Sequence, residues 1–497
     1  MTTTLAAVRH FANHAPERCA VRSRTRALTY RGLLERATAV AGALEAREIE
    51  VAAIAADNGP EWIAVDLAAQ LSGTVLVPLP PYFTREQIVH ALADSGADAL
   101  LAAPRLLALR DLDVSTLEPF AALGGELAWC RLRANPAAEM PAGTAKISYT
   151  SGTTDKPKGV CLRQSSMDIV AESLRGAVAE LEVRTHLCVL PLATLLENVA
   201  GVYAPLQNGA EIIVPNALET GLSGAARFDA ATLLRCLDAY RPESIILVPE
   251  LLAALVAALE LGTARPQGIK LVAVGGGRVS PALLERADRL GLPVYEGYGL
   301  TECASVVTLN TPAARRIGSV GRPLPHVELT LDAHGEIHVG GPAVSGYVGG
   351  DHVPQRFATG DLGQLDGDGF LHVSGRRKNL FITSFGRNVS PEWVESELTE
   401  EAPIAQAAVF GEARPWNVAL IVAVADADLA AIQAAIDAAN HRLPDYARVG
   451  DWFLADEPFT PANGLLTANG RNRRAAVWRR YRWQLDALYD RRLDLTA

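Results

Sequence analysis

Residues 147–160, ISYTSGTTDKPKGV, gather three kinds of residue that can bind phosphate. They are the hydroxyl residues Ser148, Thr150, Ser151, Thr153 and Thr154, the glycines Gly152 and Gly159, and the lysines Lys156 and Lys158. Glycines let backbone N–H groups approach phosphate oxygens, hydroxyls donate hydrogen bonds and lysines supply positive charge. The segment predicts a phosphate-binding loop, with an ordinary polar turn as the alternative. Its spacing does not match G-x-x-x-x-G-K-[ST], which excludes the nucleotide-hydrolase type of loop.

The elements around this loop alternate between helices and short strands. Between about 29 and 220, helical stretches alternate with β-rich runs such as GTVLVPL and AEIIVP. A strand at about 244–248, an apolar helix and a strand ending in three glycines follow, and the next helix should begin at Pro281 with Ser280 as its N-cap. Strand, helix and strand within about 30 residues imply a right-handed crossover. We therefore expect an α/β fold with parallel sheets.

The last third of the chain has a different character. Short β-like runs with turn signals predict a small β-rich subdomain at about 323–378. Mixed helical and β-like segments then predict a small α+β C-terminal domain, with the boundary at Lys378–Asn379. The expected domains are an N-terminal core, 1–378, and a C-terminal domain, 379–497. The tail from Ala476 should form a closing amphipathic helix.

Composition is that of an enzyme-sized globular protein. The 497 residues are 49% hydrophobic and 21% charged, which suits two or three domains and argues against disorder. A net charge of −10 with interspersed acids and bases gives little support to nucleic-acid binding. We expect a cytoplasmic protein, because no secretory signal and no apolar stretch approaching the roughly 20 residues of a membrane span is found. Six scattered cysteines without a C-x-x-C pair predict free thiols rather than a metal site.

The loop at 147–160 resembles the phosphate-binding loop of the adenylate-forming superfamily, which comprises acyl-CoA synthetases, luciferases and the adenylation domains of peptide synthetases. Further segments resemble that family's motifs in the same order, over about residues 25–475. They are PLPPYFTREQIVHALADSGADALL (78–101, the early motif), YEGYGLTECAS (295–305, adenine binding), ATGDLGQLDGDGFLHVSGRRKNLFITSFGRNVSPEWVE (358–395, ribose binding and hinge) and NGLLTANGRNRR (463–474, the C-terminal motif). The resemblance is closest to fatty-acyl and aryl-CoA ligases, and it implies that the C-terminal domain is mobile.

The resemblance implies a role for each candidate residue. The residues implied to bind ATP are Thr150, Ser151, Gly152, Thr153, Thr154, Lys156, Gly297, Tyr298, Gly299, Asp361 and Arg376, with Thr301 at the α-phosphate and Lys158 as a further catalytic residue. Among them, Tyr298 would stack on adenine and Asp361 would accept both ribose hydroxyls. Glu302 would hold Mg²⁺, and Lys378 would be the hinge of the C-terminal domain. The alternatives are a glycine-flanked turn at 297–302, a turn residue at Asp361, a surface salt bridge at Arg376 and a solvated lysine at Lys378.

The implied chemistry needs positioning and charge neutralisation rather than a nucleophilic side chain. A carboxylate oxygen attacks the α-phosphorus of ATP, pyrophosphate leaves, and the mixed anhydride then reacts with a second nucleophile. Lysines, hydroxyl residues and an acid that can bind metal suit this reaction. The G-x-S-x-G motif, which would carry a nucleophilic serine, is not found in the sequence.

Two positions depart from the family pattern. Asp155 stands where family members commonly have glycine, which places a negative charge near the triphosphate. Arg471 stands at the position of the family's catalytic lysine, with Arg473 and Arg474 nearby. Arginine keeps the charge but is planar and bulkier, so either it serves the adenylation step or that step is weakened.

The segment 189–206, VLPLATLLENVAGVYAPL, indicates the class of acid. Amino-acid-activating relatives use an aspartate near here to bind the α-ammonium group, whereas this stretch is apolar, so a substrate without an α-amine is expected. The predicted pocket residues are Leu192, Thr194, Leu195 and Glu197 in this segment and Gly275, Gly276 and Gly277 at the pocket floor. A fatty acid is the first expectation, and an aryl or polyenoic acid is the second.

The expected cofactors are ATP, Mg²⁺ and coenzyme A. Three hypotheses remain open: an acyl-CoA ligase, for which Gly386 resembles a residue of the loop that faces coenzyme A; an acyl-AMP ligase that serves a separate acyl or peptidyl carrier protein, or an amine; and a degenerate nucleotide-binding protein disabled by Asp155 and Arg471. The sequence leaves the oligomeric state open.

Overall fold

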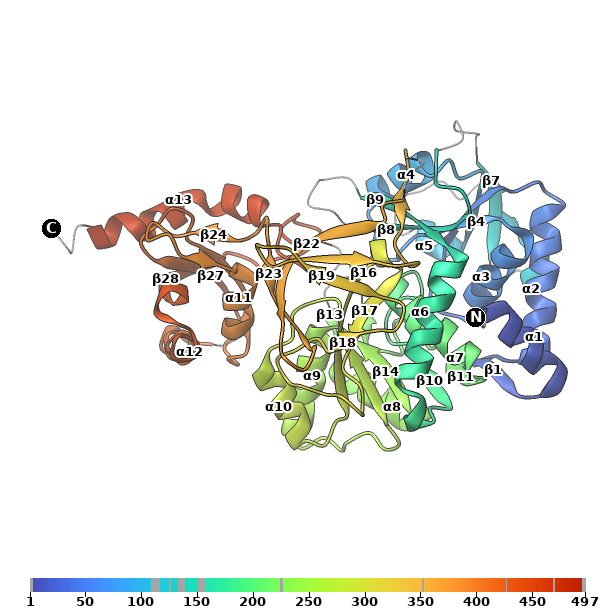
Figure 1. Ribbon diagram of the computed structural model, residues 1–497, viewed down its shortest axis with the longest axis horizontal. Helices are drawn as coiled ribbons and strands as arrows, with labels where there is room; N and C mark the ends of the chain where they lie inside the picture. The colour runs from blue at the N-terminus through green and yellow to red at the C-terminus, as the bar shows by residue number, and fades with distance from the viewer. Residues whose placement is uncertain are drawn as a thin grey trace. The chain divides into compact units, whose positions relative to one another are not determined.

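The computed structural model describes residues 3–108, 117–124, 127–132, 139–150, 157–223, 227–350, 353–425, 427–467 and 470–493. The chain divides into two units by the contacts that residues make (Figure 1). Unit 1 comprises Met1–Gly277, Ala287–Thr330 and His338–Phe357, and unit 2 comprises Arg278–Arg286, Leu331–Ile337 and Ala358–Ala497. The predicted domain boundary at Lys378–Asn379 stays a prediction.

The first sheet of unit 1 has eight strands in the order β21-β9-β8-β4-β3-β5-β7-β6. Their bounds are β21 Gly346–Tyr347, β9 Lys158–Arg163, β8 Thr144–Thr150, β4 Val75–Pro78, β3 Val51–Ala55, β5 Ala99–Ala102, β7 Ala128–Arg131 and β6 Glu118–Pro119. β3 pairs in parallel with β4 and β5, and β4 pairs in parallel with β8, as the predicted βα alternation requires. The crossover helices are α3 (Pro60–Ser72) and α4 (Arg85–Asp94), and α4 begins at a capping box between Thr84 and Gln87.

The second sheet of unit 1 has nine strands in the order β18-β17-β16-β15-β14-β10-β11-β1-β2. Their bounds are β18 Arg322–Pro323, β17 Ser305–Leu309, β16 Val294–Leu300, β15 Leu271–Val274, β14 Ser244–Leu247, β10 Thr185–Leu187, β11 Glu211–Ile213, β1 Cys19–Arg22 and β2 Ala27–Thr29. In this sheet order, each pair of neighbouring strands from β16 to β1 is parallel. The predicted strand, helix and strand are confirmed as β14, α9 (Pro249–Glu260) and β15. The next helix, α10, spans Pro281–Arg289, and the Ser280 hydroxyl accepts the Leu283 N–H at 3.2 Å, as predicted for an N-cap.

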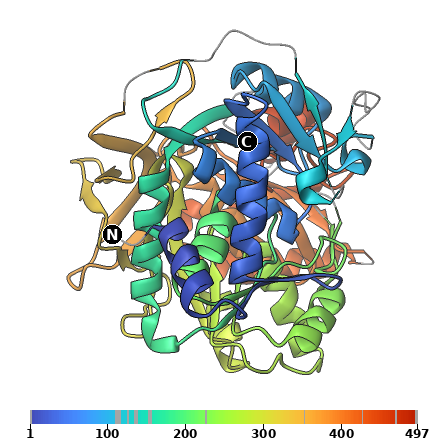
Figure 2. The same ribbon diagram turned by 90° about the vertical axis from the view of Figure 1, so that its right-hand side faces the viewer.

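Helices α1 (Thr4–His14), α2 (Tyr30–Glu45), α6 (Gln164–Ala177) and α7 (Ala204–Gln207) form a helical layer of unit 1 (Figure 2). In α2, apolar residues recur every three or four positions and are buried: Tyr30, Leu33, Ala37, Val40, Ala41 and Leu44. The helix therefore presents one continuous stripe to the core. A further helix of this unit, α8, spans Ala230–Tyr240.

A buried polar network joins α3, β8 and the π-helix η3 (Glu197–Tyr203). The Lys146 ammonium lies 2.7 Å from Asp66 Oδ1 and donates to Tyr203 Oη at 2.9 Å, and Asn198 Nδ2 donates to Asp66 Oδ2 at 2.8 Å. Burial lowers the pKa of Lys146, and the Asp66 carboxylate opposes this shift. Because Lys146 and Asp66 are 2% and 1% exposed, each charge depends on the other. The network holds η3 against the strand that leads into the phosphate loop.

Residues 328–376 form a four-stranded sheet in the order β19-β20-β22-β23, so the short strands expected in this region are present. Their bounds are β19 Glu328–Leu331, β20 Glu336–Gly340, β22 Arg356–Leu365 and β23 Leu371–Arg376. The turn between β22 and β23 is closed by Asp366, whose Oδ1 accepts the N–H groups of Asp368 and Phe370, each at 3.0 Å. The sequence of this turn is DGDG, residues 366–369.

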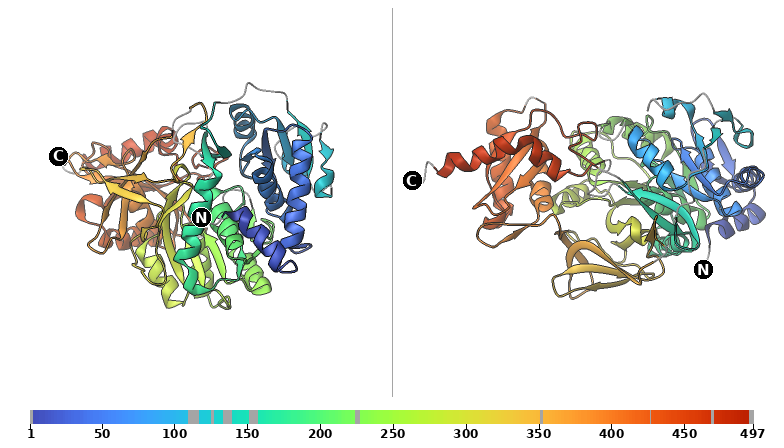
Figure 3. Two further views of the ribbon diagram at one scale, coloured as in Figure 1. Left: turned by 45° about the vertical axis from the view of Figure 1, so that its right-hand side comes forward. Right: turned by 90° about the horizontal axis from the view of Figure 1, so that it is seen from above.

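The C-terminal part of unit 2 is a three-stranded sheet with a helical layer on each face (Figure 3). Its elements are β26 Ile404–Phe410, β27 Asn417–Ala423, β28 Val449–Leu454, α11 Pro391–Thr399, α12 Leu429–Arg442 and α13 Arg474–Leu493. Ala419 and Ile421 belong to the core with α11 and α12, whereas the alternate residues Val418 and Leu420 belong to the core with α13. The predicted closing helix is confirmed as α13. No helix in the described part of the chain has both the length and the apolar character to cross a membrane.

His326, which follows β18, generates a prediction about acid stability. Its side chain is buried and its Nδ1 lies 2.9 Å from Ser173 Oγ on α6. Burial lowers the pKa of His326 from 6.5 to about 4. Between these values the unfolded chain binds a proton that the folded chain does not, so stability should fall as pH drops through this window, by up to about 3 kcal/mol. Urea unfolding of His326→Gln should depend less on pH between about 6.5 and 4 than that of the parent, and identical pH dependence would contradict the prediction.

Candidate active site

The predicted phosphate loop is the turn of the hairpin β8–β9, which we call the phosphate hairpin. The strands pair antiparallel, with Thr150 opposite Lys158. Gly159 cannot carry a side chain, because a Cβ there would lie 2.8 Å from Val348 Cγ2. Ser148 is buried, Thr150 is half-buried and Lys158 is exposed. The remaining predicted loop residues lie outside the described part of the chain: Ser151, Gly152, Thr153, Thr154, Asp155 and Lys156.

Helix α4 holds both ends of the phosphate hairpin's turn. Before the turn, Tyr149 Oη donates to Asp94 Oδ2 at 2.8 Å. After the turn, His90 Nε2 lies 2.9 Å from the Pro157 carbonyl oxygen. The early motif at 78–101 therefore has a structural role that its sequence alone did not reveal.

The adenine motif forms a tightly packed turn between β16 and β17. A Cβ on Gly299 would lie 1.8 Å from the Ser305 carbonyl oxygen, so glycine is required by the packing of the two strands. After the short helix Thr301–Cys303, Ala304 and Ser305 have φ values of 55° and 104°, which side-chain-bearing residues seldom adopt. Tyr298 is half-buried beside this turn. Backbone packing thus fixes the region around Tyr298 and Thr301.

Glu302 extends from this turn and is hydrogen-bonded to the segment that contains β21. Tyr347 Oη donates to Glu302 Oε1 at 2.9 Å, and the Ser345 N–H donates to the Glu302 carbonyl oxygen at 2.8 Å. Burial and then the neighbouring Glu302 carboxylate raise the pKa of Tyr347 well above its usual value, so the phenol keeps its proton. Glu302 Oε2 accepts no hydrogen bond from any residue that the structure describes. Half-buried, with one carboxylate oxygen held and one open, Glu302 suits a hard cation such as Mg²⁺.

Several predicted pocket residues lie near the adenine motif. A Cβ on Gly275 would lie 3.3 Å from the Gly297 carbonyl oxygen and 3.9 Å from Leu196 Cδ2. Gly276 has φ 84°, and a Cβ on Gly277 would lie 3.2 Å from Pro249 Cγ. Gly275 therefore lies between the adenine motif and the apolar segment, in which Leu192 and Leu195 are buried and Thr194 is half-buried.

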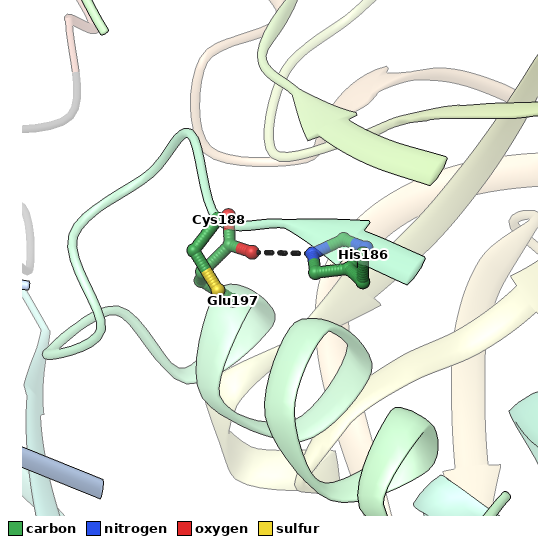
Figure 4. Close-up of side chains that lie close together, drawn as sticks. All are labelled: His186, Cys188 and Glu197. Atoms are coloured by element: carbon green, nitrogen blue, oxygen red, sulfur yellow. Dashed lines mark hydrogen bonds and ion pairs between the residues drawn. The ribbon is translucent and has the colours of Figure 1, made fainter. Parts of the chain in front are cut away.

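Glu197, in the apolar segment 189–206, is fully buried, and its carboxylate lies beside the His186 ring (Figure 4). Glu197 Oε1 lies 2.9 Å from His186 Nε2, and Oε2 accepts the Leu190 N–H at 3.0 Å. His186 Nδ1 lies 2.8 Å from Ser244 Oγ. Burial and the adjacent Glu197 carboxylate raise the pKa of Cys188 well above its usual value. Although these ligand-type atoms lie within 4.8 Å of one another, their hydrogen bonds form a buried framework, which we interpret as structural.

In unit 2, Asp361 and Arg376 stand opposite each other on β22 and β23. The Arg376 Nε forms an ion pair with the buried Asp361 carboxylate, 2.9 Å from its Oδ1. A cavity of about 370 Å³ adjoins the pair, and its lining comprises Thr359, Gly360, Arg376, Arg377 and Lys378. The predicted hinge residue and one of the predicted ribose-binding residues thus line the same cavity.

The arginines of the C-terminal motif have different surroundings. Arg474 forms two hydrogen bonds with Glu395, at 2.6 and 3.0 Å, and a third with the Val409 carbonyl oxygen at 2.8 Å. Burial raises the pKa of Glu395, and Arg474 opposes this shift. Arg471 is exposed, and its backbone N–H donates to Thr467 Oγ1 at 3.1 Å. Arg474 therefore stabilises the C-terminal fold. Arg471, which is exposed, is the better candidate for a catalytic role.

Comparison with family models decides the classification. A model described as AMP-binding enzyme matches residues 8–348, and one described as AMP-binding enzyme C-terminal domain matches residues 378–493. The first alone covers more than half of the chain. The chain belongs to the AMP-binding enzyme family.

Relatives of this AMP-binding enzyme include several coenzyme A ligases. A long-chain-fatty-acid–CoA ligase of Mycobacterium bovis is 27% identical, over 87% of this chain and 86% of the relative. A 2-succinylbenzoate–CoA ligase of Bacillus velezensis is 30% identical, over 81% and 84%. The solved structure of o-succinylbenzoate CoA synthetase from Bacillus subtilis with its acyl-adenylate intermediate superposes with a TM-score of 0.77 at 26% identity, over 95% of this chain and 97% of the other. The predicted superfamily, the α/β architecture and the enzyme class, an acid–thiol ligase, are confirmed.

Three residues of this AMP-binding enzyme that hold the site were missed by sequence reasoning. Tyr347 contacts Glu302, His186 contacts Glu197, and Asn58 accepts the Leu192 N–H at 2.8 Å. Tyr347 stands in SGYVGG, where glycine precedes the tyrosine as in the GYG of the adenine motif, and this similarity could have identified it. His186 and Asn58 carry no comparable local signal.

The two arginines should differ in their effect on stability. Arg474→Ala leaves the Glu395 carboxylate buried without its cation, so the free energy of unfolding should fall by about 3–5 kcal/mol. Arg471→Ala removes an exposed side chain and should change it by less than about 0.5 kcal/mol. Guanidinium unfolding of both variants tests this contrast, and an equal loss of stability would contradict it.

Proposed function

We propose that this enzyme activates a carboxylic acid without an α-amine to an acyl-AMP, with release of pyrophosphate, and then transfers the acyl group to coenzyme A. The observation that carries the proposal is the occurrence, within the region matched by the family model, of the phosphate hairpin and of a half-buried Glu302 whose Oε2 accepts no hydrogen bond from the described residues. Together they supply hydroxyl, lysine and carboxylate groups of the kind that a metal-bound triphosphate requires.

In this proposal the phosphate hairpin binds the pyrophosphate end of ATP. Thr150, Lys158 and the loop residues between them donate to the phosphate oxygens, and Thr301 donates to the α-phosphate. Glu302 holds Mg²⁺, which neutralises phosphate charge when it is bound. In support, a solved Bacillus subtilis o-succinylbenzoate CoA synthetase, 25% identical with a TM-score of 0.73, was obtained in complex with ATP and a magnesium ion.

Tyr298, between Gly297 and Gly299, is assigned to adenine, and the Asp361 carboxylate is assigned to the ribose hydroxyls. Arg376 orients that carboxylate through the ion pair on β22 and β23. A carboxylate can accept hydrogen bonds from both hydroxyls of a diol at once.

Lys378 and Arg471 are assigned to the part of the cycle that involves the C-terminal domain. Lys378 is the hinge that lets this domain change position between adenylation and transfer. Arg471 supplies a positive charge toward the attacking carboxylate and the α-phosphate, where relatives of the superfamily have lysine. Its exposure to solvent supports this role, because a charge that meets ATP must be accessible.

The acid pocket is assigned to Leu192, Thr194, Leu195 and the glycines Gly275, Gly276 and Gly277. The Glu197 carboxylate, held by His186 and Leu190, supports the pocket segment from behind. The apolar segment and the relatives named for long-chain fatty acids and 2-succinylbenzoate favour a fatty acid first and an aryl or polyenoic acid second. Coenzyme A is the proposed acceptor because those relatives are named as coenzyme A ligases.

An acid panel tests the proposal. The enzyme is incubated with ATP, Mg²⁺ and saturated, unsaturated and aromatic monocarboxylic acids, and acyl-AMP and acyl-CoA are measured by mass spectrometry. We expect acyl-AMP without coenzyme A and acyl-CoA when it is added. Acyl-AMP that resists coenzyme A but reacts with a carrier protein or an amine would favour an acyl-AMP ligase. No acyl-AMP with any acid would favour the degenerate nucleotide-binding protein.

Arg471→Ala should separate the two half-reactions. Loss of the charge beside the α-phosphate should reduce acyl-AMP formation by about 100-fold or more, while transfer from supplied acyl-AMP to coenzyme A should change little. Single-turnover kinetics of each step measure this difference. Arg473→Ala is the neighbouring control, and an equal loss of both steps in Arg471→Ala would refute the assignment.

A further inference from the structure

Residues 342–348, which include β21, run along the phosphate hairpin. Gly346 and Tyr347 pair with β9 opposite Cys161 and Val160, and the Val348 N–H donates to the Gly159 carbonyl oxygen at 3.0 Å. The absence of a side chain at Gly159 permits this approach. The beginning of the segment is held as well.

Two side chains form hydrogen bonds with the first residues of the 342–348 segment. Ser166 Oγ donates to the Pro342 carbonyl oxygen at 2.8 Å, and Arg163 Nη2 donates to the carbonyl oxygens of Pro342 and Val344 at 3.2 and 3.3 Å. The 342–348 segment is therefore hydrogen-bonded along its length to β9 and to the start of α6.

The same segment also contacts the turn that carries Glu302, which belongs to the other sheet of unit 1. Ser345 holds the Glu302 backbone, and Tyr347 holds one carboxylate oxygen. The turn has little freedom to move away, because its backbone at Ser305 packs directly against Gly299. The side-chain torsions of Glu302 are then the remaining freedom, and the Tyr347 hydroxyl restricts them.

We propose that Tyr347 is a positioning residue for the metal-binding carboxylate of Glu302, and that the 342–348 segment sets the spacing between this carboxylate and the phosphate hairpin. The inference rests on the proposed function. Mg²⁺ requires near-ideal octahedral geometry with ligand distances of about 2.0–2.1 Å. With Oε1 held by Tyr347, the Glu302 carboxylate would present Oε2 to a bound Mg²⁺ in one fixed orientation, and it would supply an anionic oxygen ligand there.

Tyr347→Phe tests the inference, because it removes one hydroxyl and keeps the ring. Binding is measured by calorimetry with Mg²⁺–ATP and, separately, with ATP in EDTA. We expect Mg²⁺–ATP to bind about tenfold more weakly and metal-free ATP to bind as in the parent, since the lost hydrogen bond is to a charged group that serves the metal. The Mg²⁺ concentration at half-maximal ATP binding should rise by a similar factor.

Tyr30→Phe is the matched control. Tyr30 is a fully buried tyrosine of unit 1, and its hydroxyl, like that of the half-buried Tyr347, donates one hydrogen bond to an oxygen, here the Ala210 carbonyl at 2.8 Å. This variant should lose thermal stability comparably to Tyr347→Phe without a change in Mg²⁺–ATP affinity. In a Glu302→Gln background, Tyr347→Phe should have no further effect on that affinity, because the two residues act through one carboxylate.

Unchanged Mg²⁺–ATP binding in Tyr347→Phe would overturn the inference. An equal loss of metal-free ATP binding, or additive effects of Tyr347→Phe and Glu302→Gln, would overturn it too, because either result would indicate a general structural role. Failure of the proposed function has a different signature: the parent enzyme itself would show no Mg²⁺-dependent ATP binding, and the inference would then fall with it.

Discussion

The phosphate hairpin and the Glu302 turn belong to different sheets of unit 1, and the proposed chemistry depends on how firmly their relative position is fixed. A metal that contacts both a carboxylate and a phosphate tolerates little variation in their spacing. Close packing restricts each part: a Cβ would approach neighbouring side chains at Gly159 in the hairpin and the Ser305 backbone at Gly299 in the turn. Hydrogen bonds from the 342–348 segment then connect the two parts directly.

Charges in this chain serve two separate purposes. The ion pair Lys146–Asp66 is buried, and in the pair Arg474–Glu395 the carboxylate is buried and the arginine is half-buried. Both pairs hold elements together, since removing the cation would leave a buried carboxylate without its partner. By contrast, Lys158 and Arg471 are exposed, as groups that meet a polyanionic substrate must be. Burial thus distinguishes framework charges from those available for chemistry, although residue type alone does not.

Much of the fold could be predicted from local patterns. Strand β14, helix α9, the N-cap at Ser280 and the DGDG turn follow from hydrophobic runs and turn residues that lie close together in the chain. The carboxylate and guanidinium of Asp361 and Arg376 were both named as ribose ligands through a family resemblance, and they are indeed neighbours on paired strands.

Contacts between distant residues could not be predicted in the same way. Tyr347 meets Glu302 across 45 positions, and Arg474 meets Glu395 across 79, so neither pairing has a local periodicity or motif. The sequence placed Arg471 at the position of the family's lysine with Arg473 and Arg474 nearby, and the structure adds that Arg471 is exposed whereas Arg474 pairs with Glu395. Glu197 was expected in the acid pocket as part of the apolar segment 189–206. Its hydrogen bonds to His186, on strand β10, and to the Leu190 N–H depend on how the chain folds back between residues 186 and 197.

The central claim, reversible formation of an acyl-adenylate, is tested most directly by exchange of labelled pyrophosphate into ATP without coenzyme A. If the enzyme forms acyl-AMP and pyrophosphate, label should enter ATP only when Mg²⁺ and a suitable monocarboxylic acid are both present. Label that enters ATP without any acid, or that never enters ATP although the enzyme binds Mg²⁺–ATP and the acid, would contradict the claim.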